Sequence, residues 1–569
     1  MPSARWLFPH PDPQQVAALG LTAPAARVLV HRGFADPEAA RRFLDPAFGD
    51  LHDPMLLRDM PEAVARLRQA IRKGEGILLY GDYDVDGTTS VVLLTKAIEL
   101  AGGVAGYHVP HRLKDGYGMR AEVVEAAAAD GVKLIISVDT GIRAGEVVRR
   151  ANELGIDVIV TDHHLPEADL PPAVAVLNPN RPDCRYPEKN LCGAGVAFKL
   201  VQALLATLEW PADRHRRVCE SLLKMVAIAT VADVVPLTGE NRVIVQHGLK
   251  GLRSVRNPGL RALLDVAGFS VTVPSARQVA FQIAPRINAA GRMDTARAVV
   301  ELFLTADPER ARELARQLQD LNAERQQVEA EIRERCDRIA VDGGQAALVY
   351  FAEDWHRGVL GIVASRLVER FHRPAFVLGV NPDDGLAQGS GRSIPAFHLL
   401  AALESMRDLF VRFGGHQHAA GVTLEAARVD EFRERFNAYA AAHLDPEDFL
   451  PRVETDAVVE LRDITDRAVA EVFRLAPFGH GNPPPLFAAL DAEVAGPPVV
   501  WNEKHLKLLV RQNGRTLVLK AWNFAERAAE LPARARVDIA FTLEEDAYTA
   551  ARGDPGWAAV LREVRPAAS

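Results

Sequence analysis

Short apolar runs alternate with helical patterns between residues 77 and 180. Residues 77–80, 133–138 and 157–161 are predicted as strands, whereas 88–100 and 143–154 show the longer spacing of helices. Strands that alternate with helices build a parallel sheet with helices on both faces. Such sheets bind ligands beyond the carboxyl ends of their strands, so we expect functional residues there.

One long helix is predicted between Pro308 and Gly343, because the sequence between them contains neither glycine nor proline. Its apolar positions recur at helical spacing and form a narrow stripe: Leu314, Leu318, Leu321, Val328 and Ile332. An ordinary surface helix would show the same stripe, but the length favours a helix that bridges two domains. We therefore place a connecting helix at residues 306–342.

The chain has 569 residues, which is enough for three or four domains of about 150 residues. After the long helix, apolar runs at 346–351 and 375–380 flank a helix that starts near Gly358. We expect five segments: an N-terminal extension (1–50), a parallel-sheet domain (51–305), the connecting helix, a smaller α/β domain (343–452) and a β-rich module (453–569).

The clearest feature of the last module is a hairpin. Residues 504–512 and 515–522 flank Asn513-Gly514, a dipeptide that suits a two-residue type I′ turn. In this register Lys507 faces Lys520, and Leu508 faces Leu519. One face then carries Leu506, Leu508, Val510, Leu517 and Leu519, and the other carries His505, Lys507, Arg511, Lys520 and Trp522.

The polar face of this hairpin has two interpretations. Opposed lysines destabilise a sheet, and residues 504–520 contain no acid, so the face is easier to explain if it meets a polyanion. Single-stranded nucleic acid would fit this face, because its phosphates bind cations and its bases stack on aromatic rings such as those of Trp501 and Trp522. A merely solvated face explains the pattern about equally well. The candidate contacts are Lys507, Arg511, Lys520 and Trp522.

Composition is that of an ordinary globular protein, with 48% hydrophobic and 25% charged residues. The net charge of −8 does not indicate a nucleic-acid or membrane partner, so any basic surface must be local. The four cysteines form no CxxC pair, which argues against a zinc knuckle or a disulfide framework. Neither a signal peptide nor a membrane-spanning run is recognisable, so a cytoplasmic protein without a membrane partner is expected.

Acids and histidines follow three of the predicted strands. They are Asp82, Asp84 and Asp86 in GDYDVDGTTS, Asp139 in LIISVDTG, and Asp162, His163 and His164 after residue 161. One carboxylate there would be an ordinary helix N-cap, but three clusters at one sheet edge would repel one another unless cations neutralise them. Carboxylates with imidazoles suit Mn²⁺ or Mg²⁺, and so many acids indicate two ions that hydrolyse phosphate esters. Asp233, in VADVVPL, would by itself be read as a helix cap.

These residues carry a family resemblance. DYDVDG, SVDTG, TDHH and VADVVPL resemble, in order, the four motifs of the DHH phosphoesterase superfamily, and GGHQHAAG resembles the signature of its associated C-terminal domain. GDYDVDGTTS, PHRLKDGYGM, APRINAAGRM and SGRSI further resemble the bacterial RecJ family of exonucleases specific for single-stranded DNA. The resemblance covers nearly the whole chain. It implies an α/β protein in which a DHH-type parallel-sheet domain is joined by a long helix to a smaller α/β DHH-associated domain, followed by a β-rich OB-like domain.

The resemblance also implies a metal-ligand set. The residues that would hold two Mn²⁺ or Mg²⁺ ions are Asp84, Asp86, Asp139, His163, His164 and Asp233. Asp139 is a candidate bridge, and Asp162 would orient its neighbours. Smaller DHH enzymes have a histidine where Tyr80 stands, so Asp82 is the candidate for a seventh ligand. Asp84, Asp139 and His164 are expected to be catalytic, together with His416 of GGHQHAAG.

Substrate contacts are expected on turn or glycine-rich segments, where guanidinium groups and hydroxyls can grip phosphates: Arg112, Arg286, Asn288, Arg292, Ser390 and Arg392. Any single arginine of this kind ordinarily forms a surface salt bridge. The resemblance implies a pocket for a terminal 5′-phosphate at Arg112, Arg292, Ser390 and Arg392. His416 would donate a hydrogen bond to the scissile phosphate, and His418 and His356 are weaker candidates.

The implied function is a metal-dependent 5′-to-3′ exonuclease that degrades single-stranded DNA to 5′-mononucleotides in DNA repair and recombination. It is expected to act as a monomer, with a helicase and a single-strand-binding protein as partners by analogy. Two alternatives stay open: a DHH-family phosphodiesterase for short oligonucleotides or cyclic dinucleotides, or a pyrophosphatase, and a non-catalytic scaffold that binds single strands. The basic hairpin argues against the first, and the intact ligand set argues against the second.

Overall fold

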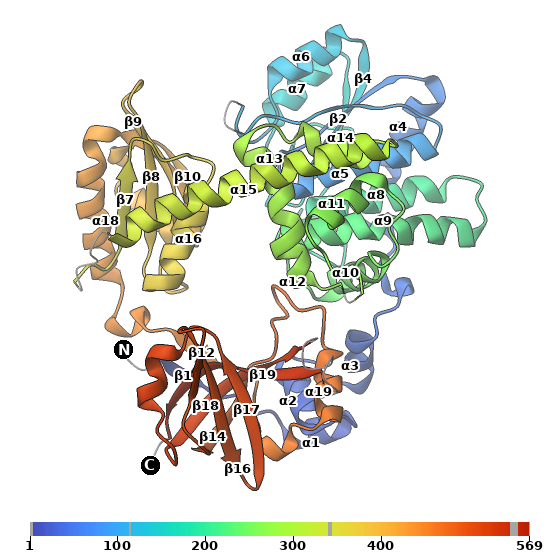
Figure 1. Ribbon diagram of the computed structural model, residues 1–569. Helices are drawn as coiled ribbons and strands as arrows, with labels where there is room; N and C mark the ends of the chain where they lie inside the picture. Colours follow the sequence, from blue (N-terminus) through green and yellow to red (C-terminus); the bar gives the residue numbers. More distant parts are fainter. Residues whose placement is uncertain (1–3, 113–114, 273, 339–343, 547–555, 568–569) are drawn as a thin grey trace.

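The computed structural model describes residues 4–112, 115–272, 274–338, 344–546 and 556–567. Helix α15 (Pro308–Arg338) runs between two of the three bodies of the molecule; the third, the C-terminal module, lies below them in the view, with the N-terminal segment beside it (Figure 1). Among the described residues, no helix has both the length and the apolar character needed to cross a bilayer.

The first domain contains a five-stranded sheet in the order β3-β2-β4-β5-β6, and every neighbouring pair in it is parallel. Its strands are β2 (Gly76–Tyr80), β3 (Gly106–His108), β4 (Val132–Val138), β5 (Asp157–Thr161) and β6 (Ala175–Leu177). The strands predicted from the apolar runs are therefore confirmed. The order reverses direction next to β2, and ligands of open α/β sheets bind at such a switch point.

Helices cover both faces of this sheet because alternate strand residues point to opposite sides. Ile135, Val158 and Val160 pack with α6 (Ala121–Ala129) and α7 (Gly145–Glu153). Leu134, Ile136 and Ile159 belong to the larger core on the other face. The helices on that side are α4 (Met60–Lys73), α5 (Val85–Leu100), α8 (Gly193–Ala206), α9 (Ala212–Ala232), α10 (Gly239–Gly251), α11 (Pro258–Val266), α12 (Ala276–Gln278), α13 (Ala284–Met293) and α14 (Arg297–Leu304).

Helix α15 (Pro308–Arg338) joins this domain to the next one, as Figure 1 shows. Leu314 and Leu318 in its first half are part of the core of the first domain. Ile332 and Cys336 in its second half pack into the smaller domain. The helix therefore bridges two cores. Residues 339–342, the end of the predicted connecting helix, and residue 343, the predicted start of the next domain, lie outside the described residues.

The smaller domain has a mixed sheet in the order β10-β11-β9-β8-β7, in which only β7 and β8 are parallel. Its elements are β7 (Leu348–Ala352), α16 (Leu360–Phe371), β8 (Ala375–Asn381), β9 (Leu386–Arg392), α17 (Leu399–Ser405), β10 (Phe410–Gly415), β11 (Ala419–Glu425) and α18 (Val429–His443). Phe376 lies at the centre of its core, with its ring against those of Phe432 and Phe436.

The C-terminal module is a five-stranded barrel. Pairing runs from β14 to β18, β19, β17 and β16, and a further pairing of β14 with β16 closes the circle. The barrel strands are β14 (Phe487–Val494), β16 (His505–Gln512), β17 (Arg515–Ala521), β18 (Arg536–Glu545) and β19 (Trp557–Pro566). Closure leaves few exposed strand edges. Strands β12 (Arg452–Glu454), β13 (Ala457–Val458) and β15 (Val499–Trp501) and helix α19 (Asp466–Phe473) accompany the barrel.

The predicted hairpin is confirmed in its register and its turn. Lys507 pairs with Lys520 and Leu508 with Leu519. Asn513 and Gly514 have φ angles of 47° and 79°, which is the left-handed backbone that a type I′ turn requires at both central positions.

Residues 1–50, which the sequence indicated as an extension, pack on the C-terminal module where they are described. Strand β1 (Arg5–Leu7) pairs in parallel with β12. Ala25, Val28 and Phe43 lie in the same apolar core as Phe487 and Phe541 of the barrel. The three helices of this segment are α1 (Pro13–Ala18), α2 (Ala23–His31) and α3 (Pro37–Leu44).

Candidate metal centre

The acidic residues meet at the carboxyl edge of the parallel sheet. Asp82 and Asp84 follow β2, Asp139 follows β4, and His163 and His164 follow β5. Asp84 is the N-cap of α5: its Oδ1 accepts hydrogen bonds from the N–H groups of Asp86 (2.9 Å) and Gly87 (3.0 Å). The cap holds Asp84 at the start of α5, and the first turn of that helix brings Asp86 into the cluster.

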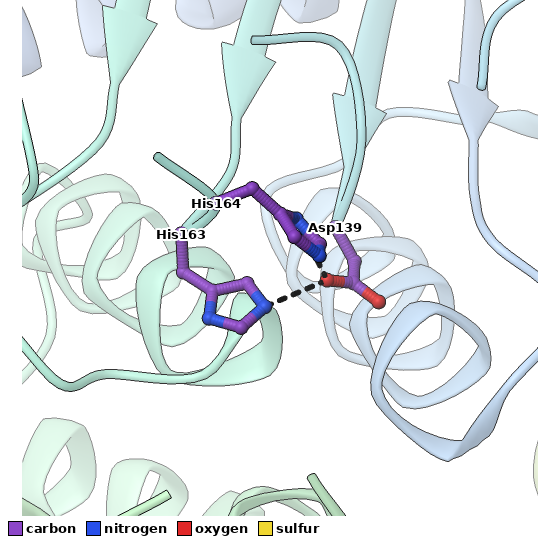
Figure 2. Close-up of side chains that lie close together, drawn as sticks. All are labelled: Asp139, His163 and His164. Atoms are coloured by element: carbon purple, nitrogen blue, oxygen red, sulfur yellow. Dashed lines mark ion pairs between the residues drawn. The ribbon is translucent and has the colours of Figure 1, made fainter. Parts of the chain in front are cut away.

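Asp139 lies at the centre of this edge. Its Oδ1 is 3.2 Å from Nε2 of His163 and 4.0 Å from Nδ1 of His164, as Figure 2 shows. Its backbone is left-handed, with φ at 59°, a conformation that Asp tolerates better than bulkier residues. Such a backbone is uncommon and turns the carboxylate away from the strand direction toward the histidines.

Nε2 of His163 also lies close to the carboxylates of Asp86 and Asp233, which form a second group of ligand atoms with it. Nε2 of His163 is 3.9 Å from Asp86 Oδ2 and 3.7 Å from Asp233 Oδ2. Asp233 is the C-cap residue of α9, far from the strands in sequence. Asp86 is fixed by the start of α8, where the N–H groups of Gly193 and Ala194 donate to its two oxygens at 2.5 and 2.8 Å.

Asp162 orients His163 and His164 through hydrogen bonds to its carboxylate. Its carboxylate accepts from the N–H groups of Ile142, His163 and His164 at 3.0, 2.7 and 3.1 Å, and from His164 Nδ1 at 2.7 Å. Burial would raise the pKa of Asp162, but these donors outweigh it and leave the pKa below its ordinary value. The contact between Nδ1 of His164 and Asp162 fixes the orientation of this ring, as groups hydrogen-bonded to a metal-binding histidine typically do.

Three other carboxylates of the cluster each have a buried oxygen that lacks a hydrogen-bond donor among the described residues. Oδ1 of Asp82, Oδ1 of Asp139 and Oδ2 of Asp233 are buried and accept no hydrogen bond within the described part of the chain. Burial and neighbouring carboxylates raise the pKa of Asp82 and Asp139 well above the ordinary value and that of Asp233 to about 9. Buried oxygens without donors are costly unless a cation meets them.

The donor set fits divalent cations that prefer oxygen ligands. Three groups have their ligand atoms within 4.8 Å of one another: Asp82, Asp84 and Asp139; Asp139, His163 and His164; and Asp86, His163 and Asp233. Asp139 and His163 each belong to two groups, which suits two adjacent ions. Burial lowers the pKa of His163 and so favours the neutral imidazole that binds metal.

Arginines gather beside this cluster. Arg112 lies over the ring of Tyr83, 4.9 Å from its centroid, and Tyr83 stands between Asp82 and Asp84. Burial, followed by the charges of Arg112, Arg325 and Arg392, lowers the pKa of Arg292 to about 10. The pKa of Arg392 is lowered by burial and by Arg112. Guanidinium groups that repel one another in a buried place favour an anion between them.

The smaller domain contributes Ser390 and Arg392 to this arginine cluster. Both lie on β9, two residues apart, and face Gly361 near the N-terminus of α16. Arg292 Nη1 donates to the carbonyl of Gly358 at 2.9 Å, just before that helix, so the two domains meet here. Helix N-termini are suited to bind phosphate.

The remaining substrate candidates have other contacts. Asn288 Oδ1 accepts from the N–H of Val85 at 3.2 Å, and Arg286 donates to Gln319 Oε1 of α15 at 2.7 Å. The first contact supports the loop of Asp84, and the second joins α13 to α15. His416 is exposed at the turn between β10 and β11, on the other domain from the acids. Its role at the scissile phosphate stays a prediction.

The basic hairpin face is partly neutralised. Arg511 pairs with Glu493 of β14 at 2.7 Å, and Lys520 pairs with Asp546. These acids lie outside the hairpin sequence, which is why the hairpin sequence alone showed none. The ring of Trp522 lies 5.6 Å from Trp501 and 4.8 Å from His505 between centroids, and the outward residues Leu509 and Val518 are also exposed.

Two features of the site escaped the sequence reasoning. One is the start of α8, whose amides fix Asp86; its Gly-Ala-Gly sequence at 193–195 was the available signal. A Cβ on Gly193 would lie 2.7 Å from Cβ of Asp139, so only glycine fits there. The other is Tyr117, whose hydroxyl lies 3.2 Å from both the carbonyl of Asp139 and Nδ1 of His164.

Comparison with protein-family models matches three parts of the chain. Residues 76–230 match the DHH family N-terminal domain, 343–442 the DHHA1 domain and 455–552 the RecJ OB domain. These matches confirm the resemblance of the motifs and the order of the three domains.

Relatives and solved structures agree. The chain is 39% identical over 542 residues to the single-stranded-DNA-specific exonuclease RecJ of Bacillus subtilis, covering 94% of this chain and 68% of the relative. It is 38% identical to the Escherichia coli protein of the same name, covering 90% and 91%. A crystal structure of RecJ with Mn²⁺ from Thermus thermophilus aligns with a TM-score of 0.84 at 33% identity, covering 99% of this chain and 80% of that one. With this site geometry and these similarities along its length, the chain belongs to the RecJ family of DHH phosphoesterases.

Proposed function

We propose that the protein is a metal-dependent exonuclease that removes nucleotides from the 5′ end of single-stranded DNA. The observation that carries the proposal is the set of buried, donor-poor carboxylates directly beside converging arginines. The named relatives are exonucleases specific for single-stranded DNA, and the Thermus structures contain Mn²⁺ or Mg²⁺. Asp82, Asp84, Asp86, Asp139, His163, His164 and Asp233 would hold the ions.

The ions, when bound, supply a hydroxide at neutral pH and stabilise charge on the phosphate and on the departing oxygen. The chain supplies orientation. Asp162 fixes both histidines, and the amides of α8 fix Asp86. Arg112, Arg292 and Arg392 would bind a terminal 5′-phosphate and so place the next phosphodiester at the metal cluster. This arrangement supports removal from the 5′ end.

The rest of the chain fits a polymer substrate. Trp501 and Trp522 and the exposed cations of the hairpin would contact bases and phosphates away from the reaction. By analogy with the family, we also propose that the protein is cytoplasmic, acts as a monomer and has a helicase or a single-strand-binding protein as a partner. A phosphodiesterase for short oligonucleotides is the second candidate, because the metal and arginine clusters alone would serve it.

The test is release of mononucleotides from matched single-stranded and duplex DNA, labelled at either end, with and without Mn²⁺. We expect metal-dependent release from the 5′ end of single strands, abolished by Asp139→Ala. Strand binding without cleavage in any metal would contradict the proposal and favour a scaffold. Cleavage confined to very short oligonucleotides would favour the second candidate.

A further inference from the structure

A segment of the C-terminal module touches the loop that follows Asp233. We call residues 474–482 the buttress segment; it lies between α19 and β14. The N–H of Leu237 donates to the carbonyl of His480 at 2.7 Å. The two glycines of this segment are closely packed. A Cβ on Gly479 would lie 2.6 Å from Leu237 Cδ1, and a Cβ on Gly481 would lie 2.8 Å from Pro236 Cβ.

The buttress segment is fixed to the first domain by Arg242 of α10. Its guanidinium donates to the carbonyls of Phe43 (2.5 Å), Leu475 (2.9 Å) and Ala476 (2.7 Å). Arg242 is 2% exposed, and burial lowers its pKa to about 9. The positive charge of Arg242 therefore faces carbonyl oxygens near the C-terminal ends of α3 and α19. The helix dipole makes the C-terminal end of a helix a favourable place for a cation.

The turn inside the buttress segment is rigid as well. Gly479 and Asn482 exchange backbone hydrogen bonds of 2.9 and 3.2 Å. The side chain of Asn482, almost fully buried, donates to the carbonyls of Leu475 and Pro477 at 2.8 and 2.9 Å. The segment thus presents a fixed surface to Pro236 and Leu237.

The loop that it touches needs support. Val234, next to Asp233, has a φ of 60°, a left-handed backbone that is rare for a β-branched residue. Such strain persists only where the surroundings over-determine the conformation. On one side Asn241 Nδ2 donates to the carbonyl of Pro236 at 3.1 Å. From the C-terminal module, the carbonyl of His480 in the buttress segment accepts from the N–H of Leu237 in this loop.

We infer that the buttress segment is a positioning element for the metal ligand Asp233, so that the C-terminal module helps to set one of the two metal sites. The inference rests on the proposed metal centre. Asp233 belongs to one ligand group, with Asp86 and His163. Disturbing the buttress should therefore weaken one ion and leave the ion near Asp82, Asp84 and Asp139 in place. Loss of a group that is hydrogen-bonded to a metal ligand typically costs about 10–100-fold in metal affinity. Because the buttress segment acts through Pro236 and Leu237, we expect an effect at the lower end of this range.

The experiment is direct titration of the full-length protein with Mn²⁺, without DNA, followed by calorimetry and by the electron paramagnetic resonance signal of free Mn²⁺. Gly479→Ala adds one methyl group against Leu237. Gly496→Ala is the matched control, because it lies in the same module with open space around its added Cβ. We expect Gly479→Ala to weaken one of two Mn²⁺ sites about 10-fold and to keep its affinity for single strands in EDTA. Gly496→Ala should match the wild type in both.

Two further variants separate positioning from general damage. Leu237→Ala removes the atoms that the methyl group added by Gly479→Ala would meet. The double variant should therefore lose less Mn²⁺ affinity than the sum of the losses in the two single variants. Arg242→Lys, which loses guanidinium donors to Leu475 and Ala476, should weaken the same site and serves if Gly479→Ala does not fold. Equal Mn²⁺ affinity in folded Gly479→Ala, or loss of both sites together, would overturn the inference. A wild-type protein that binds no Mn²⁺ would overturn the proposed function as well.

Discussion

Asp139 and Asp162 are both buried carboxylates at the same sheet edge, yet their pKa values move in opposite directions. Asp162 accepts four hydrogen bonds from Ile142, His163 and His164, and its pKa is lowered. Asp139 has an oxygen without a donor and several acids around it, and its pKa is raised. At the scale of single residues, both carboxylates are almost fully buried, so hydrogen-bond donors and neighbouring charges account for the opposite directions of their pKa shifts.

Asp139→Asn tests this difference. Asn tolerates a left-handed backbone about as well as Asp, so the loop should keep its shape. Without metal at pH 7, the variant should be more stable than the wild type by about 1 kcal/mol, because folding no longer has to protonate or bury a carboxylate whose pKa is raised by burial and by neighbouring acids. Mn²⁺ at 100 times its Kd should stabilise the wild type by about 2.7 kcal/mol and the variant far less.

Thermal unfolding with EDTA and with Mn²⁺ measures both effects. Asp130→Asn, an exposed acid at the end of α6, is the control and should follow the wild type. If Asp139→Asn gains as much from Mn²⁺ as the wild type does, Asp139 is not a ligand.

At the scale of elements, short polar contacts decide how helices and strands are placed. Helix α8 begins beside Asp86, because its first amides need acceptors and the Asp86 carboxylate supplies them. Helix α2 meets α19 through Glu471, which accepts from the N–H and hydroxyl of Thr22 at 2.6 and 2.7 Å. The hairpin is fixed by its turn, but its charge is decided by acids on neighbouring segments.

Glu471→Gln tests the contact between α2 and α19. Burial opposes ionisation of Glu471, but the donors of Thr22 and Arg467 outweigh it and lower the pKa. A lowered folded-state pKa gives stability above the unfolded pKa of about 4.3, and this stability is lost as the pH falls through the folded value. The variant should unfold about 1 kcal/mol more easily at pH 7, with the difference fading in acid.

Denaturant unfolding between pH 3 and pH 7 would show the convergence. The exposed Glu526→Gln in the same module should be neutral across this range. A pH-independent difference for Glu471→Gln would mean that the contact acts through shape alone.

The hairpin face gives a graded prediction. Replacing Lys507, Arg511 and Lys520 together by alanine should weaken binding to long single strands and flatten its salt dependence. Most of the change should come from the exposed Lys507, because Glu493 and Asp546 already pair with the other two cations.

Binding in EDTA at several salt concentrations measures the slope, with Thr516→Ala on the same face as the control. An unchanged affinity and slope in the triple variant would assign this face to solvent.

At the scale of the whole molecule, contacts between the three bodies bring distant parts of the site together. Helix α15 carries the smaller domain, whose Ser390 and Arg392 complete the arginine cluster with Arg292. The buttress segment joins the C-terminal module to the loop of Asp233. Metal binding and recognition of the strand end thus depend on different connections.

Gln326→Pro tests the first connection. Gln326 is exposed in the middle of α15, where proline removes a hydrogen bond and kinks the helix at a cost of about 3 kcal/mol. The kink should displace Arg392 from Arg292, so preference for a 5′-phosphorylated strand over a 5′-hydroxyl strand should fall at least 10-fold. Mn²⁺ affinity should stay unchanged.

Competition between the two strand ends measures the preference, and Gln326→Ala is the control that keeps the helix. A retained preference in a kinked protein would show that the smaller domain does not contribute to the pocket.

The sequence by itself determined the features that depend on local order: strands β2, β4 and β5 of the parallel sheet, the long helix, the Asn513-Gly514 register and the motifs that place Asp82, Asp139 and His163 at one sheet edge. These follow from side-chain periodicity and turn chemistry, which act over a few residues. The tertiary structure decided which distant groups meet. It brought Gly193 to Asp86, residues 474–482 to Leu237, and the first helices to the C-terminal core. No local pattern records these contacts, because they form only when the whole chain closes on itself and buried polar groups find their partners.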